Sequence, residues 1–167
     1  MAEHDEKQLH QRLRRLEDES EIRRVLMSYG PAADAGLASF AASRWVEDGV
    51  YDWDAHGEPH QGRSAVNDML RGDGHQGLIA HGVAHFAGPV LVEVDGDRAT
   101  ALNYSLIMRR GEDRFFLWRV SAVRWDVERA GSSWRVRRRT NRVLDSTGGG
   151  RQLFADVLHD LFGEDAR

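Results

Sequence analysis

Histidine is the residue type with which this sequence could do acid–base chemistry. The chain has eight histidines and no cysteine, which excludes disulfides, thiolate catalysis and zinc sites built from cysteine. A histidine titrates near neutral pH and can take and return a proton there. A carboxylate beside it would fix its tautomer, and a tyrosine phenol could polarise a carbonyl or protonate a leaving hydroxyl.

Two pairs of histidines have spacings that raise the question of a metal site. His81 and His85 share one face of a predicted strand. Four strand residues span roughly 13 Å, which is too far for both rings to hold one metal ion. His56 and His60 flank Pro59 in a predicted loop. We therefore predict neither a metal site nor a cofactor, and expect His81 to line the rim of a pocket or to face solvent.

The elements that must position these side chains follow from hydrophobic periodicity. Leucines and other apolar residues at helical spacing predict a helix over 7–29, in which Asp18 or Ser20 could begin a second segment, and another helix over 36–46. The period then changes to two, which predicts a strand near 50–54, and Ser64 can begin a short helix. The remaining predicted elements are a strand over 78–94 bent near Gly88-Pro89, strands over 99–108, 115–127 and 134–143, and an amphipathic helix over 151–162.

This order predicts an α+β fold. Asp95-Gly96-Asp97 is a strong hairpin turn, and successive hairpins make an antiparallel sheet that helices can cover on one face. A strongly curved sheet with the N-terminal helices across its mouth is a cone-shaped α+β barrel that encloses a pocket. We expect one domain over 1–167, with a core at about 14–143.

The composition and charge of the chain limit the kinds of partner that it can bind. The formal net charge is −4, whereas nucleic-acid binders show a basic excess. Arg135, Arg137 and Arg139 alternate along a predicted strand, which favours a solvated outer face or a subunit contact over phosphate binding. No apolar run is long enough to cross a membrane, and the charged N-terminus is unlike a secretory signal. These features predict a cytoplasmic protein that binds neither nucleic acid nor membrane.

Several strings of the sequence carry a resemblance to a known family. They include Leu16-Glu17-Asp18, Trp45-Val46-Glu47-Asp48-Gly49-Val50-Tyr51, His85-Phe86, Val94-Asp95-Gly96-Asp97-Arg98-Ala99 and Ser133-Trp134-Arg135-Val136. In this order the chain resembles the SnoaL-like branch of the nuclear-transport-factor-2-like superfamily over about 14–143. That branch includes scytalone dehydratase, a bile-acid dehydratase and a hexachlorocyclohexane dehydrochlorinase. Fold does not fix function in such a superfamily.

The resemblance implies a catalytic pair. Asp34 and His85 fall where those enzymes carry an Asp–His dyad, so His85 would be the general base and Asp34 its partner. Tyr29 or Tyr51 would be the electrophile or acid. The alternative for Asp34 is a helix cap, and for His85 a core histidine.

Aromatic and polar residues suggest a pocket lining. Trp53 shares a strand face with Tyr51, so Trp53 would face the cavity if Tyr51 does, and Trp45 would be core or pocket wall. Asn103 and Tyr104 point to opposite faces of one strand and are alternatives as the polar pocket residue. An aromatic lining suits a small hydrophobic molecule such as a steroid, polyketide or terpenoid.

The expected function is therefore dehydration, elimination or isomerisation without a cofactor. The first alternative is a non-catalytic binding protein with the same fold. The second is a partner resembling the β-subunit of ring-hydroxylating dioxygenases. The resemblance also implies a homodimer or homotrimer.

Overall fold

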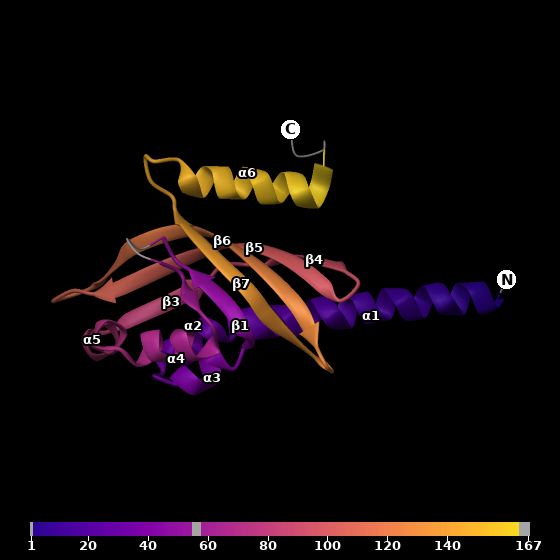
Figure 1. The fold of residues 1–167 in the computed structure, drawn as a ribbon. Helices are drawn as coiled ribbons and strands as arrows, with labels where there is room; N and C mark the ends of the chain where they lie inside the picture. The colour runs from indigo at the N-terminus through magenta and orange to yellow at the C-terminus, as the bar shows by residue number, and fades with distance from the viewer. Residues whose placement is uncertain (1, 55–57, 164–167) are drawn as a thin grey trace.

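The computed structural model describes residues 2–54 and 58–163. In chain order the elements are α1 (Ala2–Met27), α2 (Tyr29–Asp34), α3 (Ala38–Ala42), β1 (Trp45–Asp52), β2 (His60–Gln61), α4 (Arg63–Arg71), α5 (Asp73–His81), β3 (Val83–Ala87), β4 (Leu91–Asp95), β5 (Arg98–Arg110), β6 (Phe115–Ala130), β7 (Ser133–Val143) and α6 (Gly149–Phe162). Helices α1 to α4 lie on one face of a curved, twisted sheet, and α6 lies across the other (Figure 1). We call these the inner and outer faces. No described helix has both the length and the apolar character needed to span a bilayer.

The predicted N-terminal helix is confirmed, but it is interrupted after Met27 and not at Asp18 or Ser20. Helix α1 runs unbroken through Asp18 and Ser20, so the suggested second start there is wrong. Asp18 instead accepts hydrogen bonds from Trp134 Nε1 at 2.9 Å and from Arg129, which joins α1 to the end of β6 and the start of β7. Pro31 lies in the first turn of α2, where no helical hydrogen bond needs its missing N–H.

Two predicted elements were assigned wrongly. The helix predicted over 36–46 ends at Ala42, and β1 already begins at Trp45. Glycine at position 49 allows β1 to begin at Trp45 and lie close to β7. A Cβ there would meet Trp45 Cδ1 at 2.8 Å and the Val136 carbonyl oxygen at 3.0 Å. The strand predicted over 78–94 is in fact the end of α5 followed by β3 and β4. Helix α5 ends at Gly82, whose φ of 92° favours glycine.

The sheet has seven strands in the order β2-β1-β7-β6-β5-β3, with β4 also paired to β5. The hairpins β4–β5, β5–β6 and β6–β7 are antiparallel, as predicted. Strand β1 pairs with β7 in parallel, which local periodicity does not reveal. This pairing closes the N-terminal part of the chain onto the last strand and gives the open, curved sheet its cone-like inner face.

A bulge in β7 reverses which side chains face inward. Val127 pairs with Val136, but Asp126 pairs with Arg138, so one residue is inserted between them. Trp134 and Val136 are buried before this point, and Arg139 and Asn141 are buried after it. The prediction that Arg139 shares an outer face with Arg135 and Arg137 is therefore wrong, since Arg139 points into the core.

Helix α6 confirms the predicted C-terminal helix and covers the outer face of the sheet. Val157 is fully buried against this face, and the ring of Phe154 lies edge-on to Tyr104 of β5 at 4.7 Å between centroids. Arg124 of β6 binds Asp160 of α6 at 3.1 Å. The apolar side of α6 is thus largely used within its own chain.

Candidate active site

Asp34 and His85 are in direct contact. Asp34 is the last residue of α2, and His85 is the middle residue of β3. One carboxylate oxygen lies 2.5 Å from His85 Nδ1, and the other accepts the His85 backbone N–H at 2.8 Å. Both side chains are mostly shielded, with 24% of Asp34 and 14% of His85 exposed. The sequence-based expectation that these two residues meet is confirmed; their catalytic roles are a separate matter.

The contact decides the tautomer of His85. An ionised carboxylate can only accept hydrogen bonds, so Nδ1 must carry the proton that lies between the two groups. In the neutral ring, Nε2 is then unprotonated and has a free lone pair. A base of this kind can take a proton from a ligand, while Asp34 stabilises the imidazolium that results.

Close packing of α2 against β3 fixes this pair. Gly30, in the first turn of α2, lies directly against the His85 backbone. A Cβ at Gly30 would come within 2.2 Å of the His85 carbonyl oxygen, a distance that real Cβ atoms essentially never show. Glycine at this position therefore lets the end of α2 approach the strand closely enough for Asp34 to reach both the amide and the ring.

A second histidine, for which no pattern in the sequence is a signal, lies beside the dyad. His75 of α5 has its ring 5.5 Å from that of His85, with Nε2 3.2 Å from the Ala33 carbonyl oxygen. Burial lowers the pKa of His75 below its usual range; the Ala33 carbonyl and Asp34 oppose this shift, and the charge of His85 adds to it. The strand predicted over 78–94 overlaps the second half of α5, so the sequence pattern does not predict the helix that brings His75 to the dyad.

Tyr29 and Tyr51 lie on the inner face, with ring centroids 6.1 Å apart. Burial raises the pKa of Tyr29 well above its usual value, so its phenol stays protonated and can donate a hydrogen bond. The Tyr51 hydroxyl accepts a hydrogen bond from Arg139 Nη1 at 3.1 Å. Both predicted tyrosines are thus brought near one another, and Arg139 joins them.

A narrow cavity lies between His85 and Tyr29. Its free volume is about 10 Å³, which is about the space that one water molecule needs. The residues that line it come from α1, α2, β3, β5, β6 and β7, and they are Leu26, Tyr29, Gly30, His85, Phe86, Ala87, Asn103, Ser105, Trp125 and Arg139. A larger ligand can enter only if these walls move apart.

The alternative between Asn103 and Tyr104 is resolved by their environments. Asn103 is buried on the inner face, where its Oδ1 accepts from Trp125 Nε1 at 2.8 Å and its Nδ2 donates to the Tyr104 carbonyl at 2.7 Å. The Tyr104 side chain lies on the outer face against α6. Of these two residues, Asn103 is therefore the one that lines the cavity.

The other predicted ligand-binding residues lie farther out or deeper. Trp53 is half-buried and stacks on His60 at 6.4 Å between centroids. Trp45 is fully buried behind Tyr29, with its ring edge-on at 5.3 Å. His81 does not share a strand face with His85, because it ends helix α5, is exposed, and has Nδ1 2.7 Å from the Gly77 carbonyl.

No group of three or more His, Cys, Asp or Glu side chains within 2–54 and 58–163 is arranged to hold a metal ion. The His60 ring lies against the rings of Tyr51 and Trp53, at 6.4 Å between centroids in each case. His56 lies outside the described residues.

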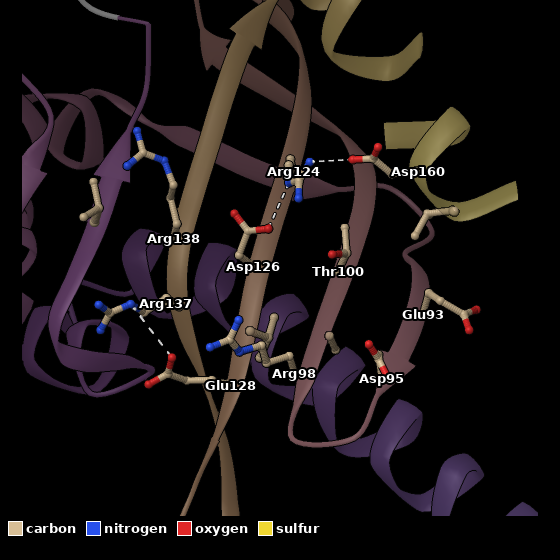
Figure 2. A pocket seen from close by; sticks show the side chains of 14 residues that line it. Glu93, Asp95, Arg98, Thr100, Arg124, Asp126, Glu128, Arg137, Arg138 and Asp160 are labelled. Carbon is tan, nitrogen blue, oxygen red and sulfur yellow. Dashed lines mark hydrogen bonds and ion pairs between the residues drawn. The ribbon is translucent and has the colours of Figure 1, made fainter. Parts of the chain in front are cut away.

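A much larger hollow, of about 710 Å³, lies on the outer face beside α6. Figure 2 shows that acidic and basic side chains alternate along its wall. Arg124 binds both Asp126 at 2.9 Å and Asp160 at 3.1 Å, and Arg137 approaches Glu128 at 3.8 Å. These charges largely satisfy one another, and neither member of the dyad reaches this face, so the inner cavity is the better candidate for chemistry.

The sequence matches the model of the SnoaL-like domain over residues 14–140. This match covers most of the chain. The chain belongs to the SnoaL-like domain family. No curated protein is similar enough in sequence to count as a match.

Solved structures agree with membership of the SnoaL-like family. An NTF2-like protein with a cystatin-like fold from Novosphingobium aromaticivorans is 43% identical, with a TM-score of 0.84 over 87% of this chain and 94% of that one. A provisionally named scytalone dehydratase from the same organism is 20% identical, with a TM-score of 0.65 over 78% and 86%. A provisionally named aromatic ring hydroxylase, also from that organism, is 23% identical, with a TM-score of 0.64 over 78% and 91%. The last two show similarity of fold alone.

Proposed function

We propose that this SnoaL-like protein is a lyase or isomerase that moves a proton on a small hydrophobic substrate without the help of a cofactor. His85 Nε2 takes a proton from a carbon next to a carbonyl group. The electron pair of the broken C–H bond passes to the carbonyl oxygen and forms an enolate. The single observation that carries this proposal is the two-point contact of Asp34 with the amide and the ring of His85.

Tyr29 is the better of the two tyrosines for the acid role. Its ring lines the same cavity as His85, whereas Tyr51 is not part of that lining. Burial keeps the Tyr29 phenol protonated, and it can donate a hydrogen bond to the carbonyl oxygen as negative charge develops there. The phenol of Tyr51 supports this arrangement indirectly, through its hydrogen bond with Arg139.

The second half of the reaction returns the proton. In a dehydration, the enolate re-forms its carbonyl, expels a β-hydroxyl group, and the imidazolium of His85 protonates that group so that it leaves as water. In an isomerisation, the same proton goes to another carbon of the conjugated system. Both outcomes leave the enzyme in its starting state, with His85 neutral and Asp34 ionised.

The test follows solvent deuterium and product absorbance with a panel of cyclic β-hydroxy ketones and β,γ-unsaturated ketones. Wild-type protein should exchange the α-proton and form the conjugated enone. His85→Gln and Asp34→Asn should lower the rate about 10²–10⁴-fold, the range expected when general acid–base catalysis is lost. Far-ultraviolet circular dichroism checks that the variants are folded.

His81→Gln is the matched control, since His81 is exposed at the end of α5 and its ring contacts the Gly77 carbonyl of its own helix. It should keep the wild-type rate. If His85→Gln is as active as wild type, the assigned base is wrong. If wild-type protein binds panel members but returns them unchanged and undeuterated, the protein is a binder rather than an enzyme.

A further inference from the structure

Arg139 is a buried cation in the wall of the cavity. Only 4% of its surface is exposed. Its guanidinium carbon lies 4.6 Å from the ring centroid of Tyr29, 4.8 Å from that of Tyr51 and 4.5 Å from that of Trp125. Aromatic faces attract a cation, and this contact offsets part of the cost of removing the charge from water.

The hydrogen bonds of Arg139 leave it unsatisfied. Nη1 donates to the neutral hydroxyl of Tyr51, but Nε is buried and has no acceptor among the residues that the structure describes. Within those residues, no carboxylate forms an ion pair with Arg139. The neighbouring Arg138 and Arg142, by contrast, both bind Asp52. A buried charge without a counter-ion is costly, so a missing anionic partner is the simplest account of this position.

A second cation adds to the positive potential. Arg119 of β6 is half-buried, and its guanidinium carbon lies 5.5 Å from the centroid of Trp53. Burial is the main cause that lowers the pKa of Arg119; Tyr51 opposes this shift, and the charge of Arg139 adds to it. Two guanidinium groups thus act on one region of the inner face, which favours a ligand with negative charge.

We propose that the inner cavity, once its walls move apart, binds the carboxylate of a small, flat organic acid, with Arg139 as its counter-ion and Tyr29 and Trp125 as the walls beside its ring. The proposed function supplies the cavity, so this inference rests on it, but binding does not need the dyad. It adds a carboxylate to the small hydrophobic substrate of the proposed function, and so specifies aromatic or polycyclic acids. A permanent charge is required because Arg139 is uncompensated before any reaction begins.

The test compares 2-naphthoate with 2-naphthamide, which has nearly the same shape and no charge. Isothermal titration calorimetry should show that wild-type protein binds the carboxylate at least tenfold more tightly than the amide. Arg139→Met should abolish this preference. Arg138→Met is the control, because Arg138 is the neighbouring guanidinium on the other side of the strand and is paired with Asp52. It should keep the preference.

A second measurement covers the case in which Arg139→Met does not fold. In wild-type protein, the Nε–H proton resonance of Arg139 should move downfield when 2-naphthoate is added and should not do so with the amide. Equal binding of both compounds, absence of 2-naphthoate binding at millimolar concentration, or a preference that survives in folded Arg139→Met would overturn the inference.

His85→Gln separates this inference from the proposed function. It should lose turnover and keep the preference for the carboxylate. If it keeps turnover as well, the dyad assignment fails and the anion site stands. If wild-type protein turns over neutral ketones but shows no preference for the carboxylate, the anion site fails and the catalytic proposal stands.

Discussion

The carboxylate of Asp34 bridges two groups of the same residue, the ring and the backbone amide of His85, at 2.5 and 2.8 Å. If Asp34 bound the His85 ring alone, the carboxylate and the ring could rotate together. The added bond to the amide ties the end of α2 to β3, so the carboxylate is held in place by the backbone of its own partner. The packing of α2 against β3 thereby fixes the orientation of the His85 imidazole.

Removal of the Asp34 carboxylate should change the tautomer of His85. In wild-type protein, nitrogen-15 shifts of the neutral His85 ring should show the proton on Nδ1, since the carboxylate accepts from that atom. Asp34→Ala should shift the population toward the Nε2–H form and lower the free energy of unfolding by about 1–3 kcal/mol, because the His85 amide loses its partner. An unchanged tautomer in Asp34→Ala would contradict the bridging role.

Gly30→Ala should damage both stability and the dyad. The added Cβ would lie 2.2 Å from the His85 carbonyl oxygen, so α2 and β3 must separate. Overpacking of this kind costs about 1–3 kcal/mol, measurable by urea denaturation. Gly77→Ala on α5 is the control, because nothing lies within 4 Å of the new Cβ. It should be neutral or stabilising by up to about 1 kcal/mol; equal effects of the two changes would refute the packing argument.

The ion pair of Asp52 with Arg142 should make the free energy of unfolding depend on pH. Hydrogen bonds from Arg142, at 2.8 and 2.9 Å, lower the pKa of Asp52, and the charges of Arg142 and Arg138 lower it further. Because the folded-state pKa is below the unfolded one, the stabilisation is fully present above the ordinary aspartate pKa of about 4 and is lost as pH falls toward the lower folded value.

Asp52→Asn should therefore lower the free energy of unfolding at pH 7 by about 1–3 kcal/mol, with a smaller difference from wild type at pH 3. Asp48→Asn is the control, since Asp48 pairs with Arg137 on the exposed surface, where such pairs contribute about 0–1 kcal/mol. Urea denaturation at the two pH values gives both differences. A gap between wild type and Asp52→Asn that does not shrink at low pH would rule out this linkage.

His75 should destabilise the fold on acidification. Burial holds its folded-state pKa below the ordinary histidine value, and the charge of His85 acts in the same direction. As pH falls from 7 to 5, the unfolded chain takes up the proton first, so the folded state loses stability in this window. His75→Gln should reduce that loss, as followed by thermal unfolding between pH 7 and 5. The same decline in His75→Gln as in wild type would show that another group is responsible.

Periodicity and turn chemistry in the sequence are sufficient for much of the fold. The turn at Asp95-Gly96-Asp97, the three long strands that follow and the C-terminal helix depend on neighbours in the chain, and all are present. The pairing of Asp34 with His85 was reached through resemblance to a family, because 51 positions separate the two residues and no local pattern joins them. Helix α5 was missed since it is short, rich in glycine and buries no residue fully.

By itself, therefore, the sequence determined the class of fold, most of the elements and the candidates for the dyad. Tertiary structure decided which faces those elements present. Arg139 points inward because a bulge in β7, visible only through its pairing with β6, reverses the alternation of side chains. Asn103 faces the cavity, and not Tyr104, because α1 to α4 and α6 cover opposite faces of the sheet. A strand's period of two is a local property, but its phase is fixed by partners far away in the chain.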